Sequence, residues 1–246
     1  MTGRFVVAVV TAGLLLTACG GGNDAPGGDV QAGQGTATVE PSSQPSSPTA
    51  TPTATASAKP TDGVAVKEVG FGKSGEFVTA VAVIHNGTDQ ISSLQVSFAA
   101  YDAAGEVLGQ QETSAPIARA NATVATTVPI EIKSGTVAKV TAEVTILDKQ
   151  KDEHPSSAFV ASGIRYRPGD VNSSVTAKIA SRYTQDVKDA YVAAVCRDAK
   201  GRIVAGGEDY YNVKGGGSTA VEVPVSGAAA KSCELYPTLG GASSTS

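Results

Sequence analysis

An internal repeat limits the folds that are open to this chain. The segment Tyr101-Asp102-Ala103-Ala104-Gly105 is matched 96 positions later by Arg197-Asp198-Ala199-Lys200-Gly201. The same offset carries Val83 onto Ile179 without a gap. Self-similarity at a fixed offset indicates that one structural unit is encoded twice. The sequence therefore predicts two copies of a small domain, each of which must close its own core.

The segments within each copy have the residue pattern of β-strands. Residues 77–84 are rich in β-branched side chains, and residues 91–101 alternate so that Leu94, Val96, Phe98 and Ala100 share one face. A further strand is expected to begin at 106, and others to cover 123–132, 136–147, 175–180, 190–196, 203–206, 218–225 and 233–236. Between them, 102–105 is expected to be a short hairpin loop with Gly105 at positive φ. About seven short strands per copy predict an all-β fold of two tandem immunoglobulin-like β-sandwich domains.

The N-terminus has the features of a secretory signal. Arg4 precedes an apolar run over 5–16, and small residues follow at Thr17 and Ala18. The sequence Leu16-Thr17-Ala18-Cys19 resembles the lipobox of bacterial lipoproteins. The resemblance implies that the signal is removed before Cys19 and that the Cys19 thiol carries a diacylglycerol. It also implies an address at the extracytoplasmic face of the cell membrane.

The segment has two alternative interpretations, a transmembrane helix and a signal peptide without a lipid. A transmembrane helix needs roughly 20 apolar residues, and this run is shorter and is followed by Gly20, Gly21 and Gly22. A secreted protein cut near Ala18 without a lipid is the remaining alternative. We expect the lipid-anchored form, since two acyl chains on Cys19 would hold the protein stably at the membrane.

Composition then divides the chain. The stretch after Cys19 is rich in Gly, Pro, Ser, Thr and Ala and buries too little apolar surface to fold. The predicted organisation is a signal peptide at 1–18, a lipidated cysteine with a disordered tether at 19–62, β-sandwich domains at 63–148 and 156–239, a charged joint at 149–155 and a disordered tail at 240–246.

Two cysteines remain if Cys19 is lipidated. Cys196 and Cys233 would be an even pair in an exported domain, which favours a disulfide. In the repeat, Cys196 falls on Ala100 and Cys233 falls near Ala142, so both cysteines are absent from the first copy. The alternative is two buried free thiols.

A second resemblance rests on Phe98-Ala99-Ala100-Tyr101-Asp102. This segment is similar to the FxLYD-type domain of bacterial surface proteins, with Ala100 in place of the expected Leu. The turn at 85–89 also looks like that family's turn before its central hairpin. The resemblance implies an immunoglobulin-like sandwich outside the cytoplasm and carries no ligand-binding residue.

Signals for chemistry are sparse. The chain has two histidines, His85 at an expected strand end and His154 in the joint, and neither belongs to a recognisable catalytic or zinc-binding pattern. The paired acids Glu208-Asp209 are expected at a solvated edge, and 215–217 is expected to be a flexible loop. We therefore predict no catalytic residue, no metal and no cofactor.

The net charge and the distribution of tyrosines indicate which kinds of partner this chain can bind. The net charge is −4, without a basic cluster, which argues against a nucleic-acid partner. Six of the seven tyrosines lie in the second copy, and Tyr is favoured at interfaces. Tyr210 and Tyr211 are the candidate binding face, with ordinary strand packing as the alternative.

The sequence thus favours a surface lipoprotein that is not an enzyme. Its partners would be the membrane, through Cys19, and an unidentified envelope or extracellular protein. A solute- or glycan-binding accessory protein is the second hypothesis, and an envelope enzyme is the third.

Overall fold

The computed structural model describes residues 61–152, 159–169 and 173–240, which belong to one compact unit. The signal peptide, Cys19, residues 19–60 of the tether, His154 and the tail from 241 lie outside these residues. None of the described segments is a helix long and apolar enough to cross a membrane. The strands are β1 Val64–Ser74, β2 Phe77–Asn86, β3 Gln90–Tyr101, β4 Val107–Ser114, β5 Thr123–Glu131, β6 Lys139–Lys151, β7 Phe159–Arg167, β8 Ser173–Ser181, β9 Val187–Arg197, β10 Ile203–Val213, β11 Ser218–Gly227 and β12 Ser232–Thr238.

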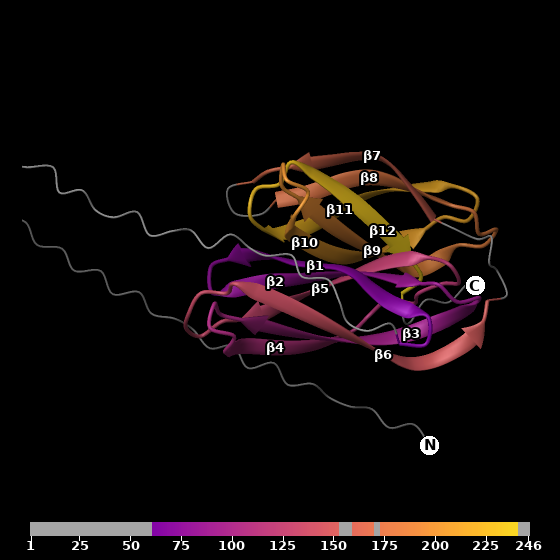
Figure 1. Cartoon of the computed structure of the whole chain (residues 1–246). Coiled ribbons are helices and arrows are strands. Elements are labelled where there is room, and N and C mark those ends of the chain that lie inside the picture. The colour runs from indigo at the N-terminus through magenta and orange to yellow at the C-terminus, as the bar shows by residue number, and fades with distance from the viewer. Residues whose placement is uncertain (1–60, 153–158, 170–172, 241–246) are drawn as a thin grey trace, which may run out of the picture. The chain divides into compact units, whose positions relative to one another are not determined.

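The fold is all-β and antiparallel, as the alternating pattern predicts (Figure 1). The first copy has two three-stranded sheets, β1-β2-β5 and β4-β3-β6. The second copy contains the corresponding trios β7-β8-β11 and β10-β9-β12, joined into one six-stranded sheet of order β12-β9-β10-β11-β8-β7. Within the described residues each copy has six strands where about seven were expected, and β1 and β7 are strands for which no range was predicted.

Glycines explain why β10 and β11 join the two sheets of the second copy, whereas the two sheets of the first copy stay separate. Gly206 pairs with Ser226 where β10 meets β11. A Cβ on Gly207 would lie 1.9 Å from the Pro224 carbonyl oxygen, so this approach of the two strands requires glycine. At the repeat offset the first copy has Gln110 and Gln111 in place of these glycines, and β4 does not pair with β5 there.

The strand register supports the duplication. Ala100 is paired with Gly109 in β3–β4, and Cys196 is paired with Ala205 in β9–β10, which is the same pairing moved by the repeat offset. Cys233 is paired with Cys196, whereas the first-copy partner of Ala100 on β6 is Val140. The position equivalent to Cys233 is therefore Val140 rather than Ala142.

The hairpin loops of the two copies are also alike. Asp102 accepts hydrogen bonds at Oδ1 from the backbone N–H groups of Ala104 and Glu106, both at 2.9 Å. Asp198 accepts the two corresponding bonds in the second copy. Gly105 has a φ of +91°, which confirms the predicted loop geometry.

The predicted joint differs from what the structure shows. β6 continues to Lys151, which is paired with Gln90 of β3. The first half of 149–155 is therefore strand, because the ladder with β3 continues through these charged residues on the exposed side of the sheet.

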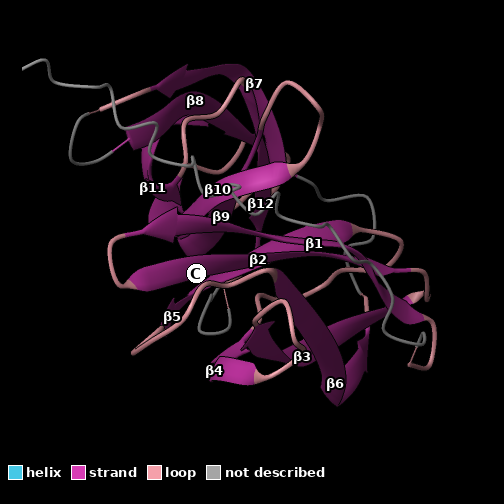
Figure 2. Ribbon diagram, turned by 60° about the vertical axis from the view of Figure 1, so that its left-hand side comes forward, coloured by secondary structure: helices cyan, strands magenta, loops and turns pink. Residues whose placement is uncertain are grey.

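Three cores hold the described residues together. The first lies between the two sheets of the first copy and includes Leu94, Val96, Phe98 and Ala100, the face predicted from their alternation. The second lies inside the second copy. The third lies between the copies and contains Val81, Val83, Ala125, Tyr191, Ala193, Val195 and Ile203. Figure 2 shows strands β9 and β10 of the second copy next to β1 and β2 of the first. The run of small and β-branched residues in β2 follows from its burial on both faces.

Glycines of β1 allow the copies to approach. A Cβ on Gly70 would lie 2.4 Å from Cβ of Ile203, and a Cβ on Gly72 would lie 2.1 Å from the Val204 carbonyl oxygen. Real Cβ contacts of this length do not occur, so β1 and β10 can be this close only with glycine at both positions.

We predict that Gly72→Ala destabilises the protein by about 1–3 kcal/mol, because backbone must move to admit the methyl group. The measurement is the free energy of unfolding from chemical denaturation. Gly217→Ala is the matched control, since its Cβ would meet nothing closer than 3.5 Å. Equal stability of the two variants would contradict the close contact of β1 with β10.

Candidate functional site

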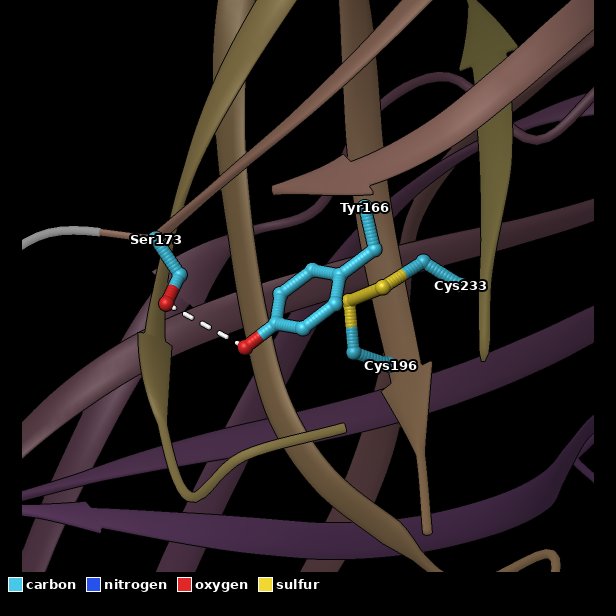
Figure 3. Close-up of a disulfide and its surroundings, with 4 residues drawn as sticks. All are labelled: Tyr166, Ser173, Cys196 and Cys233. Carbon is cyan, nitrogen blue, oxygen red and sulfur yellow. Dashed lines mark hydrogen bonds between the residues drawn. A yellow bond between two sulfur atoms is a disulfide. The ribbon is translucent and has the colours of Figure 1, made fainter. Parts of the chain in front are cut away.

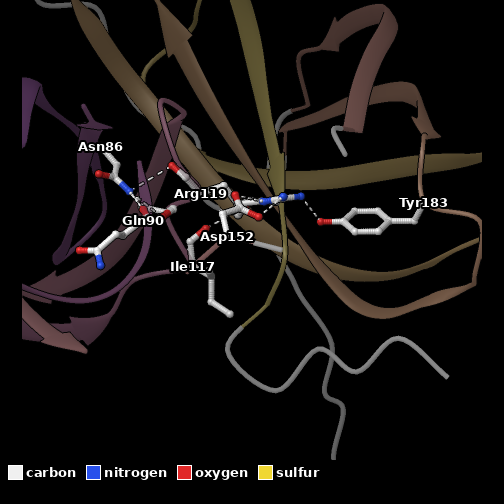
Figure 4. Close-up of polar contacts among 8 residues, drawn as sticks. Asn86, Gln90, Ile117, Arg119, Asp152 and Tyr183 are labelled. Atoms are coloured by element: carbon white, nitrogen blue, oxygen red, sulfur yellow. Dashed lines mark hydrogen bonds and ion pairs between the residues drawn. The ribbon is translucent and has the colours of Figure 1, made fainter. Parts of the chain in front are cut away.

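A buried ion pair with a tyrosine joins the two copies. Arg119, in the loop before β5, donates from Nε to Asp152 Oδ2 at 3.1 Å and from Nη2 to Oδ1 at 2.5 Å. Its Nη1 donates to the Tyr183 hydroxyl of the second copy (Figure 4). The Arg119 and Asp152 side chains are 9% and 2% exposed. Burial raises the pKa of Tyr183, while the nearby guanidinium opposes that shift. We call Arg119, Asp152 and Tyr183 the junction cluster.

Asn86 positions the loop that carries Arg119. This residue ends β2 and is fully buried. Its Nδ2 donates to the backbone oxygens of Gln90, Ala118 and Arg119 at 2.7, 2.9 and 3.1 Å. A side-chain amide that satisfies several backbone acceptors fixes the loop path, and so it fixes the guanidinium.

Glu208 forms a second polar link between the copies. Its Oε2 accepts from the Thr127 backbone N–H and from Thr127 Oγ1, both at 3.1 Å, and from the Tyr191 hydroxyl. Burial, and then the Glu208 carboxylate, raise the pKa of Tyr191. The expected solvated edge at Glu208-Asp209 is therefore wrong for Glu208, because the first copy covers this part of β10.

A third link lies at the rim. Arg197 donates to the two carboxylate oxygens of Glu68 at 2.5 and 3.1 Å, and Glu234 lies 3.7 Å away. A planar guanidinium fits a carboxylate in this two-bond geometry. These three links and the third core fix the position of one copy against the other.

Three of the six second-copy tyrosines serve this contact, namely Tyr183, Tyr191 and Tyr236. Tyr191 is buried in the third core, and Tyr236 packs against it. Tyr210 is 53% exposed. Its ring makes an edge-to-face contact with the Tyr191 ring, with the ring centroids 5.4 Å apart. Tyr211 points to the opposite side of β10, where its hydroxyl donates to the Glu222 carbonyl oxygen at 2.6 Å. The structure thus does not bring Tyr210 and Tyr211 into one face, and Tyr210 is the accessible member of the pair.

The predicted disulfide is confirmed. Cys196 and Cys233 are bonded directly across β9 and β12, with Cα atoms 4.1 Å apart. Figure 3 shows the Tyr166 ring beside the sulfur atoms. The Tyr166 hydroxyl donates a hydrogen bond to Ser173 Oγ at 3.2 Å. The bond therefore links neighbouring strands of one sheet and is covered from the second-copy core side.

A cleft of about 320 Å³ lies between the copies. It is lined by residues 119–124, Phe159 and 235–238. The cleft has an arginine wall, but both ends of that guanidinium are already bonded within the junction cluster. It is a candidate site for a small ligand that makes apolar contacts and hydrogen bonds.

The remaining candidates have structural roles. His85 lies 3.1 Å from Thr123 Oγ1 through Nδ1, at the end of β2. Gly215 and Gly216 donate their N–H groups to Asp186 and to the Tyr183 carbonyl oxygen. Within the described ranges, no group of three His, Cys, Asp or Glu is placed to hold a metal ion.

Comparison with protein-family models gives no match for this chain. Comparison with curated protein sequences gives none either. The lipoprotein and FxLYD resemblances therefore remain predictions from the residues themselves.

The disulfide closes a loop of 37 residues. The chain-entropy relation gives a stabilisation of about 4 kcal/mol for such a loop. We expect Cys196→Ala/Cys233→Ala to lower the free energy of unfolding by an amount of that order, measured by denaturant titration. Reductant should destabilise the wild type and leave the double variant unchanged. A wild type indifferent to reductant would contradict this role.

Arg119→Met would leave the Asp152 carboxylate buried without its cation. Breaking one side of a buried pair costs about 3–5 kcal/mol, so we expect a loss of that size in the free energy of unfolding. Arg119→Met/Asp152→Leu should be less destabilised than the single variant. Lys149→Met, which breaks an exposed pair with Asp62, is the control and should cost less than about 1 kcal/mol. A single variant no worse than this control would show that the junction cluster does not hold the copies.

Proposed function

We propose that the protein is a membrane-anchored extracytoplasmic lipoprotein that acts as a non-catalytic interaction or envelope-scaffold module. The observation that carries the proposal is the lipobox-like sequence ending at Cys19. The bonded pair Cys196–Cys233 supports it, because disulfides form and persist in oxidising compartments outside the cytoplasm.

The contact between the copies supports a scaffold role. Two domains on a flexible linker would change their relative orientation freely. Here an apolar core, the junction cluster and the Glu208 link lie between them. A partner would meet one fixed surface, with no ordering of the copies needed on binding.

A solute-binding accessory lipoprotein is the second candidate. The cleft between the copies favours it, because a volume of about 320 Å³ suits a small ligand. The mixed wall of Asn121, Phe159 and Tyr236 offers both polar and apolar contacts.

The anchor is tested by labelling cells with an alkyne analogue of palmitate. Wild type should take up the label and remain in the membrane fraction, and Cys19→Ala should do neither. Cys196→Ala/Cys233→Ala is the matched control, since it removes the other two cysteines without touching the lipobox. Unlabelled wild type, or labelled Cys19→Ala, would overturn the lipid anchor.

The interaction role is tested by crosslinking in intact cells followed by mass spectrometry. If Tyr210 contributes to a binding face, Tyr210→Ala should lose a crosslinked envelope protein that wild type retains. Val160→Ala, at an exposed apolar side chain of β7, is the control and should retain that protein. Identical crosslinked partners for both variants and wild type would remove Tyr210 from the proposal.

A further inference from the structure

The outer face of the sheet β4-β3-β6 is a polar surface with one aromatic ring. Its central strand presents Gln95, Ser97, Ala99 and Tyr101, the residues that alternate with the buried ones. Strand register places the following beside them: Ser114, Glu112, Gln110 and the exposed Val107 on β4, and Thr145, Glu143, Thr141 and Lys139 on β6. Rows of hydroxyl, amide and carboxylate groups thus flank a tyrosine.

This face is hollowed. A depression of about 250 Å³ has Ala99 in its lining, together with Glu112, Thr141 and Tyr101. A second depression, of about 590 Å³, lies over the hairpin loop at 102–105 and is also bordered by Tyr101 and Thr141. The two depressions share these residues, so together they form a trough that passes the Tyr101 ring. From Ser97 to Tyr101, the part of β3 that lines the trough, the strand covers about 13 Å, which suits an extended ligand.

Several polar groups are held in place within the trough. Glu112 accepts from Ser97 Oγ at 2.8 Å and from Gln95 Nε2 at 3.2 Å. Lys139 Nζ lies 6.0 Å from the centre of the Tyr101 ring and steadies that ring from the neighbouring strand. The trough therefore offers oriented acceptors and donors beside an aromatic surface.

The second copy shows that the fold does not require this chemistry. The repeat offset places Tyr191, Ala193 and Val195 where the first copy has Gln95, Ser97 and Ala99. In the second copy these residues form the third core and are covered by the first copy. The equivalent first-copy face is open and carries hydrogen-bonding groups.

We infer that this trough, formed by the outer face of β4-β3-β6, binds a neutral oligosaccharide. Sugar hydroxyls both donate and accept, which matches the mixture of carboxylate, amide and hydroxyl groups. The C–H face of a pyranose ring packs on an aromatic ring such as Tyr101. Carboxylates at Glu112 and Glu143, with a single ammonium at Lys139, disfavour an anionic glycan or an anionic membrane surface. A protein partner would have to bury both carboxylates, whereas interface cores are depleted of charge.

The proposed sugar site does not depend on the lipid anchor, because every residue that lines the trough lies between Ser97 and Glu143 and none is near Cys19 in the sequence. It is tested by calorimetric titration of the purified full chain with cellohexaose, maltohexaose and chitohexaose. We expect at least one to bind. Ala99→Leu, which fills the floor of the trough, and Tyr101→Ala should each weaken that binding by about tenfold or more, and Glu112→Gln should weaken it by a similar factor.

Glu222→Gln is the matched control. Glu222 accepts from Ser174 Oγ at 2.8 Å on an exposed face of the second copy, so it reproduces the Ser97–Glu112 pair outside the trough. The Glu222→Gln variant should bind the sugar with the affinity of wild type. Cooperative thermal unfolding of every variant should show that each one is folded. Two results would each overturn the inference: no binding of any of the three sugars at millimolar concentration, or unchanged binding by Ala99→Leu and Tyr101→Ala.

Discussion

The packing of one sheet of each copy against the other is the interaction on which the described structure depends. Val81 and Val83 of β2 lie in one apolar cluster with Tyr191 and Ala193 of β9, and all four are buried. Without this layer, β2 and β9 would each expose an apolar face that a monomeric soluble domain rarely shows. With it, two small sandwiches share a third core. Small domains bury a modest fraction of their surface alone, so a shared core matters most for chains of this size.

Charged groups refine that contact. The junction cluster buries a guanidinium and a carboxylate, which is unfavourable unless geometry and partners compensate for the lost hydration. Arg119 meets this requirement with two bonds to Asp152 and one to Tyr183. Glu208 meets it with two bonds from Thr127 and one from Tyr191. Such groups tolerate few alternative orientations, and so they select one arrangement of the copies over sliding of one apolar sheet on the other.

Duplication left the two copies free to take different roles. Equivalent β3 and β9 positions are polar in the first copy and apolar in the second, because the second copy's face became the contact. Half of the tyrosines of the second copy, Tyr183, Tyr191 and Tyr236, take part in this internal contact. The open face of the first copy is the one left with oriented polar groups and an aromatic ring, and the proposed sugar site follows from that difference.

The sequence by itself determined the features that depend on residues close together in the chain or on the alternation of apolar and polar side chains along a strand. The alternation of Leu94, Val96 and Phe98 fixed the buried side of β3, and the Asp-x-x-Gly loops fixed both central hairpins. The disulfide was predictable because two cysteines, an even number, remain in a domain that is expected outside the cytoplasm. Tertiary structure alone decided which polar groups are buried: Arg119 and Asp152 are 33 positions apart, and Thr127 and Glu208 are 81 apart. No local pattern marks such partners, because each side chain is ordinary in its own strand or loop and becomes buried only when two finished sheets pack together.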